Sequence, residues 1–183
     1  MPRPGLRLPG AFDGFEIAVR AVVGQQITIK AARTLVGRFA ARFGQPIETP
    51  SAALHILFPA PAQIAELGYS DIAANGILSA RSKTIIALAR AIADGELVLE
   101  PGADVERTIR TLRAVPGVGE WTAQYIAMRA LSWPNAFPHT DYGVLKAMGE
   151  KNPRVALERA AEWQPWRAYA VIHLWNSLEV AQA

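Results

Sequence analysis

The sequence predicts an all-α protein made of two helical lobes. Apolar side chains recur every three to four residues in one segment after another, glycines and prolines separate these segments, and no alternating strand pattern competes with them. At 183 residues, the chain is long enough for one substantial core or for two small lobes that share a cleft. It contains no cysteine, which excludes disulfides, thiolate metal sites and a cysteine nucleophile.

The first half of the chain predicts three long helices and two short ones. Gly24, Gly44 and Gly95 each follow an apolar helical stripe, and glycine commonly ends a helix. Four prolines between residues 45 and 62 predict a loop with one short turn at about 52–57. The expected helices lie at about 12–23, 27–43, 62–67, 69–74 and 78–93.

Short polar side chains mark the helix starts in the second half. Asp104 is expected to cap one helix, because its carboxylate can accept hydrogen bonds from free amides of the first turn. Thr140 or Asp141 is expected to cap another, and Asn152 followed by Pro153 begins a third. The expected helices run from 104 to 114, from 120 to about 131, from 140 or 141, from 152, and from 165 to about 180.

The charges are unevenly distributed. The formal net charge is +3, but residues 1–44 carry seven basic and two acidic side chains, which is +5 and leaves −2 for the rest. A basic segment fits a polyanionic partner, although solvated helix faces explain the same charges. The sequence shows no run of about eighteen apolar residues and no basic-then-apolar leader, so we expect a soluble cytoplasmic protein without membrane contact.

The most distinctive motif lies between Leu112 and Asp141. Two predicted helices are joined by the tight turn Pro116-Gly117-Val118-Gly119, and the free amides at the start of the second helix form an anion site. A lone Asp141, in a Pro-His-Thr-Asp context, follows about twenty residues later. Taken alone, an aspartate such as Asp141 is more often an ordinary N-cap than a catalytic residue.

These motifs resemble the helix-hairpin-helix DNA glycosylase superfamily, and most closely its AlkA-type 3-methyladenine branch. The resemblance covers almost the whole chain, from Leu8-Pro9-Gly10 through Val23-Gly24-Gln25-Gln26 to Pro165-Trp166-Arg167 and His173-Leu174-Trp175. It implies a single glycosylase core over residues 1–183 with a DNA-binding cleft between its lobes. One lobe is expected at about 27–131, and the other from about 1–26 together with 132–183.

The AlkA branch usually carries a further α/β domain before this core. Almost nothing precedes Leu8 here. We therefore expect either a minimal enzyme or the core of a longer or fused polypeptide.

The resemblance assigns the chemistry to Asp141. As the base leaves, positive charge builds on the deoxyribose, and a fixed carboxylate stabilises it or orients water at C1′. A position near a helix start favours the ionised form of that carboxylate. The base pocket is expected to be aromatic, although aromatics at such spacing are most often core residues: Trp121, Tyr125, Tyr142 and Trp175. Three other indoles are expected in the core: Trp133, Trp163 and Trp166.

Two glycines and one glutamine are expected to contact DNA. By resemblance, the amides of Gly117 and Gly119 bind a phosphate, and Gln26 fills the gap left by an extruded nucleotide. The AlkA type can carry an apolar wedge there, so Gln26 is a departure that could hydrogen-bond the orphaned base; an ordinary polar connector explains it as well. Polar residues early in the 78–93 helix could also touch phosphate, although exposed polarity explains them equally: Ser79, Arg81, Ser82 and Lys83.

No cofactor is expected to be required. In the family, main-chain carbonyls around the hairpin hold a monovalent cation, and the matching carbonyls belong to Arg113, Val115 and Val118. A structural Na⁺ or K⁺ could therefore bind there. The sequence neither confirms nor excludes this ion.

Trp121 indicates a monofunctional mechanism, because strand-cutting relatives carry at this position a lysine that forms a Schiff base. The absence of cysteine separates the chain from iron–sulfur relatives. We expect a monomeric, nucleoid-associated bacterial enzyme that hydrolyses the N-glycosidic bond of alkylated purines, such as 3-methyladenine and 7-methylguanine, in double-stranded DNA and leaves an abasic site. Two alternatives remain: a non-catalytic DNA-binding hairpin module, and a glycosylase for mismatched or deaminated bases.

Overall fold

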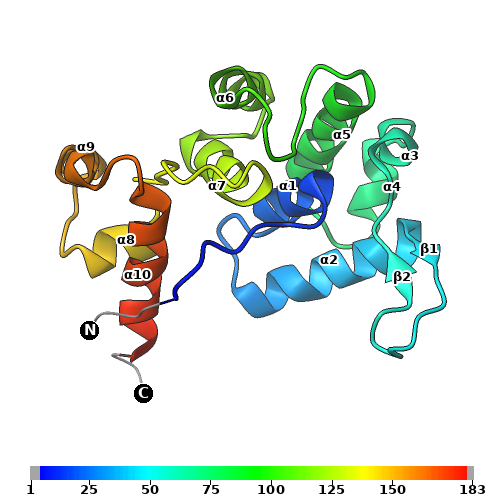
Figure 1. Cartoon of the computed structure of the whole chain (residues 1–183). Coiled ribbons are helices and arrows are strands. Elements are labelled where there is room, and N and C mark those ends of the chain that lie inside the picture. Colours follow the sequence, from blue (N-terminus) through cyan, green and yellow to red (C-terminus); the bar gives the residue numbers. More distant parts are fainter. Residues whose placement is uncertain (1–4, 181–183) are drawn as a thin grey trace.

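The computed structural model describes residues 5–180 and confirms the all-α prediction (Figure 1). Within these residues, no helix combines the length and hydrophobicity that crossing a membrane would require. The elements are, in order, α1 (Gly14–Val23), α2 (Ile29–Phe43), β1 (Gln45–Pro46), β2 (Ile56–Leu57), α3 (Pro61–Ala65), α4 (Tyr69–Ala73), α5 (Ser79–Ala93), α6 (Val105–Ala114), α7 (Glu120–Ala130), α8 (Tyr142–Ala147), α9 (Pro153–Arg159), the 3-10 helix η1 (Ala160–Trp163) and α10 (Arg167–Val180).

Three predicted N-caps are confirmed. The side chain of Asp104 accepts a hydrogen bond from the Arg107 amide at 3.0 Å, and that of Asn152 accepts one from the Arg154 amide at 3.0 Å. Asp141, rather than Thr140, caps α8. Each cap satisfies an amide that the helix itself leaves free.

The helices α1 and α2 begin later than predicted, because a polar side chain caps each of them. Asp13 accepts a hydrogen bond from the amide of Glu16, so α1 begins at Gly14 and Phe12 lies before it, fully exposed. Thr28 caps α2 in the same way. The apolar stripe predicted for the first helix therefore wrongly included Phe12, which lies before α1.

The proline-rich segment forms more than the predicted loop. β1 and β2 pair antiparallel, with Gln45 opposite Leu57 and Pro46 opposite Ile56. The paired segments are only two residues long each, so they escape an analysis that depends on periodicity.

The helices surround two hydrophobic cores that meet at α7. The large core is built from α1 to α7, and the small core gathers residues between α7 and α10. Figure 1 shows α1 beside α7 and α5, with α8, α9 and α10 forming a separate group. The predicted division placed residues 1–26 with 132–183; α1 instead packs in the large core, because its inward face is almost entirely apolar. Leu8 packs against the small core.

The three tryptophans expected in the core differ in environment. Trp133 packs against both cores and Trp163 against the small one. Trp166 is 59% exposed, which corrects the prediction. It precedes α10, and its ring meets the edge of Tyr169 with 5.8 Å between ring centroids.

Candidate active site

Three hydrogen bonds hold the carboxylate of Asp141. Oδ1 accepts one from the amide of Val144 at 2.8 Å and one from the indole Nε1 of Trp175 at 2.9 Å. Oδ2 accepts one from the indole Nε1 of Trp121 at 2.8 Å. The donors come from α8, α10 and α7, so the carboxylate lies where the elements of both cores meet.

Three of the four predicted pocket aromatics lie together. The rings of Trp121 and Tyr125 are stacked, 5.2 Å apart with an interplanar angle of 14°. The ring centroid of Trp175 lies 6.4 Å from that of Tyr125, and the two ring planes make an angle of 46°. All three are half-buried. They form a π-rich wall beside Asp141, which suits a flat, electron-poor ligand.

Tyr142 differs from these three aromatics. It begins α8 and is 78% exposed. It lines a shallow hollow with Leu145, Lys146 and Lys151, on the surface of α8. Although it follows Asp141 directly, the structure shows no ring pair between Tyr142 and the other three aromatics among the residues described.

Gly143 is a site residue that the sequence analysis missed. A methyl group added there would lie 3.1 Å from Oδ1 of Asp141 and 3.1 Å from Cδ1 of the Trp175 indole. These distances are tighter than ordinary contacts, so a side chain at 143 would push the indole away from the carboxylate. The sequence shows a glycine two residues after Asp141, but it does not show that this glycine faces the Trp175 indole.

The loop that delivers Asp141 is anchored at two points. The Gln124 side chain accepts a hydrogen bond from the amide of Phe137 at 3.1 Å. Nε of Arg167 donates to the main-chain and side-chain oxygens of Asn135, at 3.1 and 2.8 Å. Burial lowers the pKa of the Arg167 guanidinium. The anchors come from α7 and α10, the same helices that supply the indole donors.

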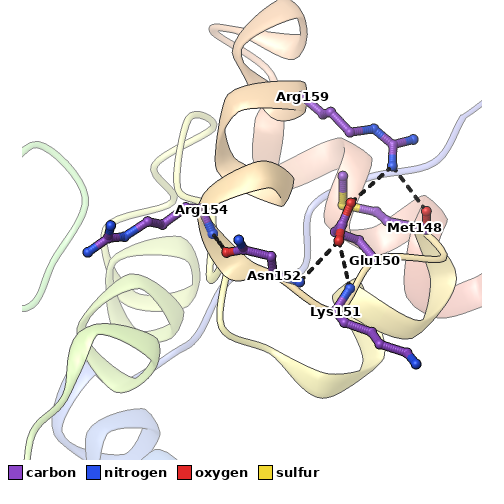
Figure 2. A network of polar contacts seen from close by, with 6 residues as sticks. All are labelled: Met148, Glu150, Lys151, Asn152, Arg154 and Arg159. Atoms are coloured by element: carbon purple, nitrogen blue, oxygen red, sulfur yellow. Dashed lines mark hydrogen bonds and ion pairs between the residues drawn. The ribbon is translucent and has the colours of Figure 1, made fainter.

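A polar network braces the turn after α8 (Figure 2). Glu150 Oε1 accepts hydrogen bonds from the amides of Asn152 and Lys151, at 3.1 and 2.8 Å, and these bonds lower the pKa of its carboxyl group. Arg159 adds a weaker attraction at 3.9 Å and donates to the main-chain oxygen of Met148 at 3.3 Å. The network fixes the end of α8 relative to α9.

The hairpin turn is held against α5. Gly117 has a φ of +89°, a left-handed conformation that favours glycine, and a side chain there would run into Thr84. Thr84 in turn donates to the main-chain oxygen of Pro116 at 2.8 Å. Gly117 and Gly119 are both exposed, and among the described residues neither amide donates to another main-chain group outside the helices. Their amides are therefore available to an anion.

The turn between α1 and α2 is tied to this hairpin. Nε2 of Gln25 donates to the main-chain oxygen of Gly117 at 3.1 Å and to Oγ1 of Thr122 at 3.0 Å. The guanidinium of Arg81 donates to the main-chain oxygen of Gln25. Gln26 is exposed and has a φ of +55°, which places it at the tip of a sharp turn.

Two of the other polar residues expected near phosphate make contacts within the protein. Ser82 is fully buried, and its hydroxyl donates to main-chain oxygens of Ile77 and Leu78. The ammonium of Lys83 lies over the ring of Tyr69, 4.8 Å from its centroid. Ser82 therefore cannot reach a phosphate in this conformation.

The three carbonyls expected around a hairpin cation have few main-chain hydrogen-bond partners among the described residues. Among the main-chain hydrogen bonds outside the helices of residues 5–180, none uses the oxygens of Arg113 or Val118. The Val115 oxygen accepts one from the Val118 amide at 3.0 Å and keeps its second lone pair. Oxygen donors of this kind suit a hard monovalent cation.

This chain is similar in sequence to known DNA repair proteins. The family model of the HhH-GPD superfamily base excision DNA repair proteins matches residues 19–156. The probable bifunctional transcriptional activator/DNA repair enzyme AlkA of Mycobacterium tuberculosis is 45% identical over 180 residues, which are 96% of this chain and 36% of that protein. DNA-3-methyladenine glycosylase 2 of Escherichia coli is 36% identical over 173 residues, covering 94% of this chain and 61% of that protein. The chain thus spans less than two thirds of either relative.

A solved structure supports the same fold. The 3-methyladenine DNA-glycosylase from Archaeoglobus fulgidus superposes with a TM-score of 0.78 at 24% identity, over 91% of this chain and 59% of that one. At this identity the likeness concerns the fold alone. Taken with the match over residues 19–156 and the two relatives, it leads to one conclusion: the chain belongs to the HhH-GPD superfamily of base excision DNA repair proteins.

Proposed function

We propose that this chain is a monofunctional DNA glycosylase that releases alkylated purines from double-stranded DNA. The observation that carries the proposal is the Asp141 carboxylate, held by two indole N–H groups beside a wall of three aromatic rings. The names of the two relatives support the substrate class, since one is a DNA repair enzyme AlkA and the other a DNA-3-methyladenine glycosylase.

The reaction breaks the bond between C1′ of the deoxyribose and the base nitrogen. Both electrons of that bond leave with the base, so positive charge develops on the sugar. Asp141 stabilises this charge as a fixed anion. Oδ1 already accepts two hydrogen bonds and Oδ2 only one, so Oδ2 keeps a lone pair for the sugar or for the attacking water. The water oxygen bonds to C1′ and gives its proton to the solvent, while the cationic purine departs as a neutral base and an abasic site remains.

The aromatic wall explains a preference for alkylated bases. Alkylation at a ring nitrogen makes a purine cationic, and a cation is attracted to the face of an indole or phenol ring. Tyr125 covers one face of the Trp121 ring, and in this proposal the base stacks on the opposite face. A base must leave the duplex to reach these rings.

The hairpin supplies the grip on DNA in this proposal. The amides of Gly117 and Gly119 bind a phosphate of the lesion strand, and a Na⁺ or K⁺ ion on the carbonyls of Arg113, Val115 and Val118 would add positive charge there. Trp121 lies only two residues after Gly119, on the first turn of α7. The first turn of α7 therefore connects the phosphate-binding amides to Trp121, which hydrogen-bonds the Asp141 carboxylate.

Trp121 also carries the monofunctional part of the proposal. Its indole N–H donates a hydrogen bond to Asp141, and an indole nitrogen cannot form a Schiff base with the sugar. The enzyme is therefore expected to release the base without cutting the strand.

A single-turnover assay tests the function. The whole chain is mixed in excess with duplex DNA treated with a methylating agent, and the release of 3-methyladenine and 7-methylguanine is followed over time. Release of methylated purines without strand cleavage is expected. If the chain binds duplex but releases no base, it is a DNA-binding hairpin module. Release confined to mismatched or deaminated bases would show a glycosylase with another substrate.

A further inference from the structure

Gln25 is placed between the two parts of the molecule that the proposed function assigns to DNA. Its side-chain amide bonds the hairpin at the Gly117 oxygen and at Oγ1 of Thr122, across more than ninety residues of sequence. Its neighbour Gln26 belongs to the same turn but is exposed, whereas Gln25 is half-buried. Gln26 has a left-handed φ of +55° at this sharp turn.

The turn is held from a second side. Arg81 on α5 donates to the main-chain oxygen of Gln25. Thr84, three residues later on α5, donates to the main-chain oxygen of Pro116 in the hairpin at 2.8 Å. The α1–α2 turn and the hairpin thus share bonds with each other and with one turn of α5.

We propose that Gln25 is a positioning residue that locks the Gln26 turn to the phosphate-binding hairpin, so that gripping a phosphate places Gln26 in register with the lesion. The inference rests on the proposed function, because it needs the hairpin to bind phosphate and Gln26 to enter the duplex. Extruding a nucleotide leaves a gap in the base stack, and filling it requires a side chain held by rigid backbone.

The lock also explains why a polar residue occupies position 25. Nε2 donates to the main-chain oxygen of Gly117 and to the hydroxyl oxygen of Thr122, and an apolar side chain at position 25 would leave both acceptors without this donor. Gln25 needs no contact with DNA for this role. It acts through Gln26.

A double-mutant cycle tests the inference by binding, using a duplex that contains a tetrahydrofuran abasic analogue and an undamaged duplex of the same sequence. Gln25→Leu keeps the side-chain size and removes both hydrogen bonds. It should weaken binding to the abasic analogue about tenfold, the order expected for two neutral hydrogen bonds, and change binding to undamaged duplex less than about twofold. In a Gln26→Ala background, the same Gln25→Leu change should cost less than about twofold on the abasic analogue.

Two further variants keep the test clear of folding effects. Thr122→Val removes one of the two acceptors with little change in shape, and should show a smaller loss of about threefold that also vanishes in the Gln26→Ala background. Gln63→Leu is the matched control, because its Nε2 likewise donates to a main-chain oxygen, that of Phe43 at 2.9 Å, away from the hairpin. It should leave both affinities unchanged.

Equal losses with and without Gln26 would overturn the inference, as would an equal loss on undamaged duplex, which would show that Gln25 only supports the hairpin. Binding to the abasic analogue does not need catalysis. A chain that binds it but releases no base would therefore refute the proposed function while the cycle still decides the role of Gln25.

Discussion

Replacing Asp141 with asparagine separates the capping role of this residue from its chemistry. Asparagine caps helices about as well as aspartate, so Oδ1 can still accept from the amide of Val144 and from the indole of Trp175. The negative charge is lost, and an NH₂ group replaces Oδ2. In the unmodified chain, Oδ2 lies 2.8 Å from Nε1 of Trp121, so the NH₂ group would face the indole N–H. Two donors then oppose each other.

The size of the effect follows from these losses. Removing one group that stabilises developing charge costs about 2.7–4 kcal/mol, and losing a hydrogen bond to a charged acceptor costs about 1.5–3 kcal/mol. The two overlap, so we expect base release to fall by roughly two to four powers of ten. Binding to undamaged duplex should change little, because the hairpin is untouched.

Asp104→Asn provides the matched control. Asp104 caps α6 through the amide of Arg107 at 3.0 Å, so it receives the same chemical change in the same structural role. Single-turnover release of 3-methyladenine is measured for both variants, with thermal unfolding to check the fold. If Asp141→Asn released base as fast as Asp104→Asn, Asp141 would be a cap and nothing more.

Three other changes address separate features of the site. Gly143→Ala should slow base release on the order of tenfold, because the added methyl displaces the Trp175 indole, while the helix gains propensity and the melting temperature changes little; unchanged release would show that this packing is not needed. Trp121→Lys should lose base release and yield at most traces of borohydride-trapped DNA adduct, since a lyase also needs a lowered amine pKa; strong trapping by the unmodified chain would contradict a monofunctional mechanism. Glu150→Gln should lower the melting temperature at pH 7, and the difference from the unmodified chain should shrink as the pH is lowered, because a carboxyl group whose pKa is lowered in the fold stabilises it above the ordinary glutamate pKa of about 4.3 and ceases to do so as the pH falls through the lowered value. A difference that stays constant as the pH is lowered would assign the effect of Glu150 to something other than its charge.

Local signals explain what the sequence predicted correctly. Asp104, Asp141 and Asn152 cap helices through amides only two or three residues away, so the relevant partners are visible in the sequence. The position of Asp141 relative to the hairpin was likewise a matter of spacing. Gly117 was predicted as a turn residue from the neighbouring prolines and glycines alone, and its left-handed φ of +89° confirms the prediction.

Contacts between distant segments explain what was missed. The indoles of Trp121 and Trp175 both point their N–H groups at Asp141, across 20 and 34 residues, and only the packing of α7 and α10 brings them there. Residues 25 and 26 have the same side chain, but Gln25 is half-buried and bonds the hairpin while Gln26 is exposed, and only the packing of the turn against the hairpin decides this. The placement of α1 in the large core similarly depended on which helices it meets.

The sharing of α7 between the two cores bears on how the molecule opens. Ala123 and Ile126 belong to the large core, Met128 to the small one, and Tyr125 packs against both. Neither core can come apart without exposing side chains of this helix, so the free energy of opening either core includes a contribution from α7. In native-state hydrogen exchange, the amides around Ile126 should be among the last to exchange. A site assembled across such a joint depends on both cores remaining folded.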